Sequence, residues 1–202
     1  MLADYIAARL AEADRIPAAR ADTLRRLADH VVARREAGRT ARLTFICTHN
    51  SRRSHLAQIW ARVAADHFAV PDIETHSGGI EATALAPGVV DALRRAGLLV
   101  ERTGEGDNPV YRIRYRDDAP PVTAFSKIYN HPPNPTADFC AVMTCAEADA
   151  GCPVVPGAAA RIALPYADPK IHDGTDRETG MYDARCRQIA REMLYVFSRV
   201  AG

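Results

Sequence analysis

The sequence carries no excess of charge of either sign. Its 202 residues include 26 Lys and Arg against 25 Asp and Glu, which gives a formal net charge of +1 at pH 7. A protein that binds nucleic acid or an anionic membrane through a broad charged surface needs a large field of one sign. We therefore expect neither of these partners, and any site for an anion has to be local.

Long apolar segments are also lacking. No stretch approaches the roughly 18 apolar residues of a membrane span, and charged residues at Asp4, Arg9 and Glu12 precede any long apolar run. The sequence thus predicts neither a membrane span nor a secretory signal, and we expect a cytoplasmic protein. In that reducing compartment, the odd number of five cysteines indicates reactive thiols and not a disulfide framework.

The chain has no internal repeat and no low-complexity segment. Hydrophobic residues make up 48% of it and charged residues 25%, which is typical of a folded globular protein. We expect an N-terminal helical extension over residues 1–38 and a catalytic domain over residues 39–202, with an irregular, proline-rich insertion at about 103–135. The extension could cap the sheet, or it could form the interface of a homodimer.

Apolar segments alternate with helical patterns along the main part of the chain. The segments typical of strands are short and rich in apolar residues, and they lie at 43–47, 73–76, 139–145 and 161–164. A further strand is expected from Leu98. Strands that alternate with helices predict a parallel sheet that is covered on both faces. We therefore expect an α/β fold with an open, mostly parallel sheet of four to five strands.

A polar loop follows the first of these strands. Cys47 lies at the carboxyl end of the strand, Arg53 follows six positions later, and a helix is expected to begin at Ser54. Ligands of open parallel sheets bind beyond the carboxyl ends of the strands, where loop N–H groups and the positive end of a helix favour an anion or a thiolate. We predict that Cys47 is an activated nucleophile and that Arg53 binds two oxygens of a tetrahedral oxyanion.

The other residues of the loop are candidates for the same site. Ser54 can donate a hydrogen bond to the sulfur of Cys47, and Asn50 can hold the loop backbone. Arg52 and His49 fit two interpretations, because each could either bind the anion or be a solvated side chain at the rim. The residues expected around the oxyanion are Thr48, His49, Asn50, Ser51, Arg52, Arg53 and Ser54.

The segment Cys47-Thr-His-Asn-Ser-Arg-Arg53-Ser54 resembles the phosphate-binding loop of the low-molecular-weight protein tyrosine phosphatases and the related arsenate reductases. Ser77-Gly-Gly-Ile-Glu81 is similar to the segment after that family's second strand, and Tyr166-Ala-Asp168-Pro169 looks like its Asp-Pro loop. The similarity covers about residues 42–102 and 139–200. It implies an enzyme with Cys47 as the nucleophile and Asp168 as the general acid, whereas an aspartate before a proline is otherwise most often a turn residue.

Three positions depart from the usual pattern of the family. His49 stands where glycine is usual, and Arg52 stands where a second cysteine is usual. Gln58 occupies the position at which relatives that bind a potassium ion tend to have glutamate. We therefore expect no metal and no other cofactor at this site.

Two further cysteines separate two possible reactions. Cys145 and Cys152 are separated by six residues, and their segment resembles the redox stretch of thioredoxin-coupled arsenate reductases. The resemblance implies that Cys47 attacks arsenate, that Cys145 attacks Cys47 as arsenite leaves, and that Cys152 then forms a disulfide with Cys145. Thioredoxin would reduce that disulfide and is the implied partner. The small residues between the two cysteines favour a mobile segment.

Two alternatives need fewer residues. A low-molecular-weight protein tyrosine phosphatase would hydrolyse phosphomonoesters through a cysteinyl-phosphate and would need only Cys47, Arg53 and Asp168. Cys145 and Cys152 would then be incidental thiols, as we expect for Cys140 and Cys186 in the core. A non-catalytic protein that binds an oxyanion is the second alternative. The matched cysteine spacing makes arsenate reduction the function that we favour.

Overall fold

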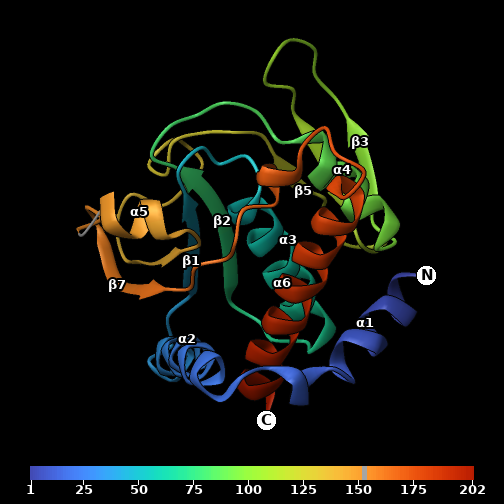
Figure 1. Cartoon of the computed structure of the whole chain (residues 1–202). Helices are drawn as coiled ribbons and strands as arrows, with labels where there is room; N and C mark the ends of the chain where they lie inside the picture. The colour runs from blue at the N-terminus through green and yellow to red at the C-terminus, as the bar shows by residue number, and fades with distance from the viewer. Residues whose placement is uncertain (152–153) are drawn as a thin grey trace.

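The computed structural model describes residues 1–151 and 154–202, and a four-stranded parallel sheet lies at its centre (Figure 1). The strand order is β2 (Ile73–Gly79), β1 (Ala41–Cys47), β6 (Phe139–Met143) and β7 (Ala158–Ala163). All three pairings are parallel, and β1 lies between β2 and β6. The predicted α/β fold with an open parallel sheet is therefore confirmed, with four strands.

The core of the protein lies mainly between one face of this sheet and two long helices. Helix α3 (Arg53–His67) packs on β1 and β2, and helix α6 (Glu178–Ala201) packs on α3. The opposite face carries a smaller apolar cluster, in which Ile46 and Met143 pack with Ala148 of the short helix α5 (Ala146–Gly151). The part of the segment between the two cysteines that the structure describes is helical up to Gly151, in keeping with the high helix propensity of its alanines.

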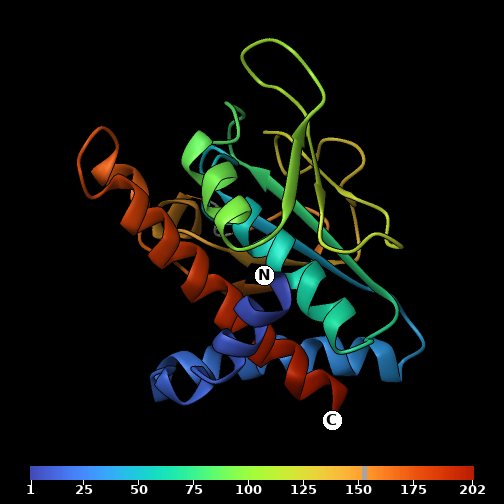
Figure 2. The same cartoon turned by 90° about the vertical axis from the view of Figure 1, so that its right-hand side faces the viewer.

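The N-terminal region forms two helices, α1 (Leu2–Leu10) and α2 (Ala18–Glu36), with the 3-10 turn η1 (Ala13–Arg15) between them. Both helices contact α6, and α2 also contacts β1 and β7 (Figures 1 and 2). The apolar side chains of α2, such as Leu24, Leu27 and Val31, are fully buried. Among the described residues, no helix combines the length and the apolar composition that a membrane span requires.

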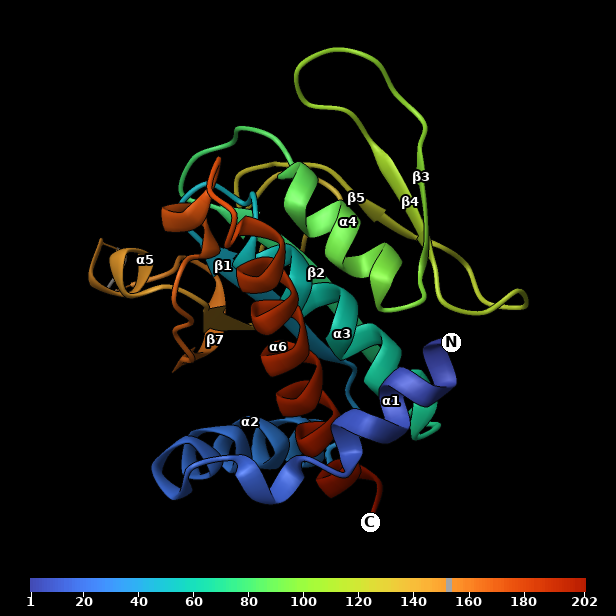
Figure 3. The ribbon, with the colours of Figure 1, turned by 45° about the vertical axis from the view of Figure 1, so that its right-hand side comes forward.

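The middle of the chain builds a second, smaller sheet beside helix α4 (Pro87–Arg95), as Figure 3 shows. Its strands β3 (Leu99–Arg102), β4 (Tyr111–Arg114) and β5 (Val122–Ala124) are antiparallel neighbours in this order. The strand expected from Leu98 therefore belongs to this sheet and not to the parallel one. Its burial explains the difference, because only Val100 of its four residues is buried, whereas strands of a parallel sheet are buried on both faces.

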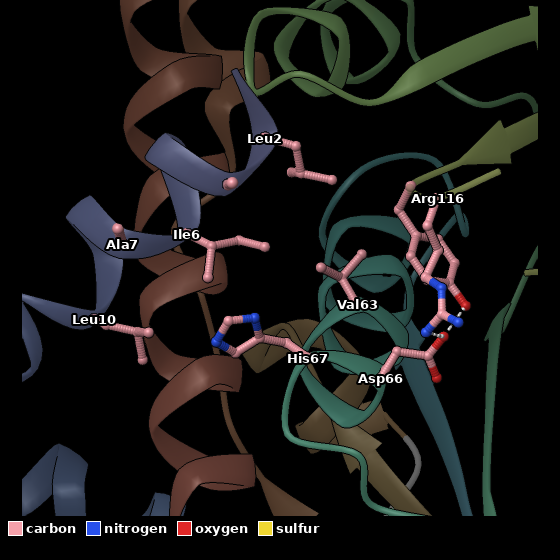
Figure 4. Close-up of a pocket in the computed structure, with 10 residues that line it drawn as sticks. Leu2, Ile6, Ala7, Leu10, Val63, Asp66, His67 and Arg116 are labelled. Atoms are coloured by element: carbon pink, nitrogen blue, oxygen red, sulfur yellow. Dashed lines mark hydrogen bonds and ion pairs between the residues drawn. The ribbon is translucent and has the colours of Figure 1, made fainter. Parts of the chain in front are cut away.

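An apolar pocket of about 340 Å³ lies between α1 and the end of α3 (Figure 4). Leu2, Ile6 and Leu10 of α1 line it together with Val63 and His67 of α3. Helix α3 begins next to Cys47, whereas this pocket lies at the opposite end of the helix. The pocket is therefore separate from the loop described below.

Candidate oxyanion site at the end of the central strand

Cys47 is the last residue of β1, and five residues separate it from Arg53, the first residue of α3. Its Sγ lies 3.1 Å from Ser54 Oγ, and Asn50 Nδ2 donates to the same hydroxyl at 2.9 Å. Asn50 adopts a positive φ of 44°, a left-handed conformation that asparagine tolerates better than most residues. The loop thus folds back so that the side chains of Asn50 and Ser54 meet at the thiol of Cys47.

Arg53 joins this loop to the segment after β7. Its guanidinium donates to Tyr166 O at 3.1 Å through Nη1 and to Asp168 Oδ2 at 2.7 Å through Nη2. The other carboxylate oxygen of Asp168 accepts from Lys170 N at 3.0 Å, so Asp168 caps the 3-10 turn η2 (Pro169–His172). Glu147 of α5 lies 3.5 Å from Arg53 Nη1 on the exposed side. Arg53 and Asp168, which are 115 positions apart in the chain, therefore lie in direct contact.

A second thiol lies beside the same loop. Cys145 follows β6, and its Sγ is 3.5 Å from Thr48 Oγ1 and 3.3 Å from the N–H of Ala148. Burial raises the pKa of the Cys145 thiol, while the contacts with Thr48 and Ala148 and the charge of Arg53 act in the opposite direction. The proximity follows from the fold, because the carboxyl ends of neighbouring parallel strands meet at one edge. Cys152 lies outside the described residues.

The rest of the loop faces protein groups. Arg52 donates to Tyr182 OH at 2.7 Å and to Asp173 Oδ2 at 3.2 Å, so it is not a solvated side chain at the rim. His49 is about half exposed, with Nε2 at 3.6 Å from Glu81 Oε2. Ser51 is buried, and its carbonyl accepts the N–H of Ala86. The loop is therefore fixed through its backbone at the start of α4 and through the Arg52 side chain at α6.

A segment after β5 also holds the loop, and our sequence analysis did not identify it. Ser126 Oγ donates to His49 O at 2.8 Å, and the backbone N–H of Lys127 donates to Asn50 Oδ1 at 2.9 Å. The side chain of Lys127 is buried, which lowers its pKa to about 8. The ammonium lies 4.7 Å from the centre of the Phe125 ring. A lysine inside the apolar stretch 124–129 was the only sign of this role in the sequence.

Other candidate groups lie away from the thiols of the loop. Cys140 and Cys186 are buried in the core, where burial raises their pKa to about 12 and about 11. Gln58 donates to Thr75 O at 3.1 Å, so its side chain is bound to the backbone of β2. Within residues 1–151 and 154–202, no three or more His, Cys, Asp or Glu side chains are arranged to hold a metal ion.

Comparisons with known proteins place this geometry in context. No protein-family model matches the chain. An arsenate reductase of Bacillus licheniformis is 28% identical over 155 residues, which cover 76% of this chain and 92% of that protein. A mutant of YwlE from Bacillus subtilis has a TM-score of 0.52 at 12% identity, covering 81% of this chain and 100% of that structure.

A low-molecular-weight phosphotyrosine phosphatase from Vibrio cholerae O395 gives a similar result. Its TM-score is also 0.52, at 13% identity, and the match covers 78% of this chain and 95% of that structure. At such low identity, these two structures establish a common fold and nothing about the reaction. The arsenate reductase adds a relationship in sequence over most of the chain.

Proposed function

Because the chain belongs to the low-molecular-weight protein tyrosine phosphatase and arsenate reductase family, we propose that it reduces arsenate to arsenite through a relay of disulfides. One observation carries this proposal. The Cys145 thiol lies beside the loop of Cys47, with its Sγ 3.5 Å from Thr48 Oγ1. A hydrolase of this fold needs no second thiol there, whereas a reductase requires one.

The first step takes place at Cys47. Backbone N–H groups of residues 48–53 and the guanidinium of Arg53 bind arsenate, in the way that loops before helices bind anions. The Cys47 thiolate, next to the Ser54 hydroxyl at 3.1 Å, attacks arsenic and forms an S–As bond. One oxygen leaves as water after Asp168 donates a proton. Arsenic remains in its +5 state in this intermediate.

The second step transfers two electrons. The Cys145 thiolate attacks Cys47 Sγ, a Cys47–Cys145 disulfide forms, and the electron pair of the S–As bond stays on arsenic, which leaves as arsenite. Cys152 then attacks Cys145 and releases Cys47 as a thiolate. Thioredoxin reduces the Cys145–Cys152 disulfide and thus supplies the two electrons. The role of Cys152 rests on the sequence resemblance, and a supply of reduced thioredoxin implies a cytoplasmic location.

The second candidate function is hydrolysis of phosphomonoesters. The contact of Arg53 with Asp168 at 2.7 Å supports it, because a phosphatase needs only the loop and a general acid close to the bound ester. In that reaction Asp168 protonates the leaving group, and it then activates the water that hydrolyses the cysteinyl-phosphate. Cys145 would have no chemical role.

An assay of both reactions with the same protein separates the two functions. Arsenate reduction is followed as NADPH consumption with thioredoxin and thioredoxin reductase, and hydrolysis is followed with an aryl phosphate. A reductase should turn over arsenate in the wild type, and Cys145→Ser should prevent the release of arsenite. Cys152→Ser should allow about one turnover and then accumulate a Cys47–Cys145 disulfide. Cys140→Ser is the matched control, because Cys140 is equally buried but lies within β6 opposite Leu43 and not beside the loop.

The outcomes point in different directions. Neither Cys145→Ser nor Cys152→Ser should change the hydrolysis of the aryl phosphate, because that route uses the loop and Asp168 alone. Rapid hydrolysis without NADPH consumption that depends on arsenate would exclude the reductase and support the phosphatase. Binding of phosphate or arsenate without either turnover would instead indicate the non-catalytic oxyanion-binding protein.

A further inference from the structure

Arg20 connects the N-terminal extension to the segment that carries Asp168. From helix α2, its Nη1 donates to Pro165 O at 3.0 Å, and its guanidinium carbon lies 4.5 Å from the centre of the Tyr166 ring. Pro165 and Tyr166 directly precede Ala167 and Asp168 in the chain. A side chain 145 positions away in sequence therefore contacts both the backbone and the ring of this segment.

A buried carboxylate fixes the position of Arg20. Glu192 of α6 is 1% exposed, and its Oε2 accepts from Arg20 Nε at 3.0 Å and from Arg20 Nη2 at 2.8 Å. Its other oxygen accepts from Gln188 Nε2 at 3.0 Å. A carboxylate at this depth is stable only with such partners, and the planar guanidinium allows little rotation once two of its nitrogens are bound. The remaining nitrogen, Nη1, is thereby aimed at Pro165 O.

The segment after β7 depends on such side-chain donors. The N–H groups of Leu164 and Tyr166 still bind carbonyls at the end of β6, at Met143 O and Thr144 O. Pro165 and Pro169 on either side of Asp168 have no N–H, so they add no backbone donor. The carbonyls of this segment accept hydrogen bonds from two arginine side chains. Arg20 donates to Pro165 O at 3.0 Å, and Arg53 donates to Tyr166 O at 3.1 Å. Arg53 also binds Asp168 itself.

We propose that Arg20 is a positioning residue for the general acid, and that the N-terminal extension thereby forms part of the active enzyme. The inference rests on the proposed function in one respect, namely that Asp168 donates the proton. Arg20 itself does not contact the substrate. It holds residues 165–166 so that the carboxyl group of Asp168 lies where Arg53 and the bound oxyanion meet. Errors of about 1 Å in such a position can cost about 100-fold in rate.

The test compares two arginines of the same helix. Arg20→Met removes the contact with Pro165, and the double variant Arg20→Met/Glu192→Gln does so without leaving a buried charge unpaired. Arg34→Met is the matched control, because Arg34 makes an equally short bidentate ion pair from α2, to Asp138 before β6. Melting temperatures of the three variants show that each protein is folded at the assay temperature.

The contribution of a general acid is measured by how strongly kcat/KM depends on the leaving group of the ester. Phenyl phosphate needs a proton on its leaving oxygen, whereas 2,4-dinitrophenyl phosphate releases a stable anion without one. In both Arg20 variants, kcat/KM should fall about 10- to 100-fold for phenyl phosphate but less than about 2-fold for the dinitrophenyl ester. Inhibition by inorganic phosphate should not change. Arg34→Met should affect both esters equally, and Asp168→Asn should give the Arg20 pattern more strongly.

Hydrogen exchange supplies a readout that does not depend on turnover. The amides of residues 166–168 should exchange faster in the Arg20 variants than in Arg34→Met. Unchanged exchange there, or an equal loss on both esters, would overturn the proposal. If Asp168→Asn shows the leaving-group effect and the Arg20 variants do not, only the role of Arg20 is wrong. If Asp168→Asn shows no such effect, the assigned acid is wrong, and the role of Arg20 falls with it.

Discussion

Arg53 Nη2 lies 2.7 Å from Asp168 Oδ2, so the arginine at the start of α3 is paired with the carboxylate that follows β7. The same guanidinium holds Tyr166 O at 3.1 Å. Arg53 therefore orients the Asp168 segment, and in the proposed mechanism the same guanidinium also binds the oxyanion. In that mechanism, an anion bound in the loop would lie next to a carboxylate that Arg53 already holds.

This pairing predicts the behaviour of Asp168→Asn. The amide keeps the shape of the side chain and can still contact Arg53, but it has no proton to donate to a leaving oxygen. The chemical step should slow by about 10²–10⁴-fold, while the dissociation constant of inorganic phosphate changes little. Single-turnover kinetics and phosphate inhibition measure the two quantities. A change confined to stability would show that Asp168 is only a turn residue.

Cys47 should be unusually reactive toward an alkylating reagent. Its sulfur lies 3.1 Å from Ser54 Oγ, which Asn50 holds from the other side, and α3 begins directly after the loop. Alkylation by iodoacetamide at pH 6 should be faster at Cys47 than at an ordinary exposed thiol, and phosphate or arsenate should protect it. Ser54→Ala should slow alkylation several-fold. If Cys47 reacts no faster than a free thiol and anions do not protect it, the site is assigned wrongly.

The sequence predicts the part of the site whose residues follow one another in the chain. Residues 47–54 contain the end of a strand, a polar loop and the start of a helix, and the change in periodicity marks all three. The contacts of Ser126, Lys127 and Arg20 could not be predicted in the same way, because they join segments 77 to 145 positions apart. Such contacts depend on how helices and sheets dock, and no local pattern in the sequence encodes them.

Arg52 illustrates a second limit. Its position in the loop fitted either an anion-binding or a solvated side chain, and the structure instead directs it to Tyr182 and Asp173. Helix α6 brings Tyr182 there from the far end of the chain. The strand after Gly97 shows the same limit for the sheet, because local propensity predicts a strand but not the strand with which it pairs.

His55 should make the protein sensitive to mild acid. It is fully buried next to Ser77, and burial together with the charge of Lys127 lowers its pKa to about 3. Below pH 6.5 the unfolded chain takes up a proton at this residue and the folded chain does not, so the free energy of unfolding decreases as pH falls toward 3. At about 1.4 kcal/mol per pH unit, the loss from pH 6.5 to pH 5 is about 2 kcal/mol.

Urea unfolding at several pH values between 7 and 5 measures this loss. His55→Gln has no titrating group and should flatten the pH dependence over this range, even if it lowers stability at pH 7. His67→Gln, at the exposed end of the same helix, should keep the slope of the wild type. An unchanged slope in His55→Gln would show that other groups cause the acid sensitivity.

The insertion at 103–135 should resist proteolysis as well as the core does. Asn108 binds the backbone of Ser126 in both directions, with Nδ2 to the carbonyl at 2.8 Å and the N–H to Oδ1 at 3.1 Å. Asn108→Ala should therefore increase cutting by trypsin within the insertion. It should also lower the affinity for phosphate, because Ser126 holds the carbonyl of His49 in the loop. Thr103→Ala, which affects only a local contact with Val110, is the control. Rapid cutting of the wild type with full activity retained would contradict the expectation that the insertion is firmly packed and the expectation that it supports the site.

Gly79 should be intolerant of any side chain. A Cβ at this position would lie 2.7 Å from Asn50 N and from Thr48 O, and it would also collide with the carbonyl of Glu81. The backbone of the oxyanion loop would have to move, because none of these atoms belongs to a flexible side chain. Gly79→Ala should therefore weaken phosphate binding by about 10-fold or more, in line with the loss expected when the donors of such a loop are displaced.

A second glycine separates this steric effect from the general effect of replacing glycine. Gly180 lies in helix α6, and a Cβ there would meet no atom within 4 Å. Gly180→Ala should stabilise the protein by about 0.5–1 kcal/mol, because alanine is the better helix former, and it should leave the phosphate affinity unchanged. Phosphate protection of Cys47 against alkylation measures the affinity in both variants. Equal protection in Gly79→Ala and the wild type would mean that the loop can relax around the added methyl group, so its geometry would not depend on close contact with β2.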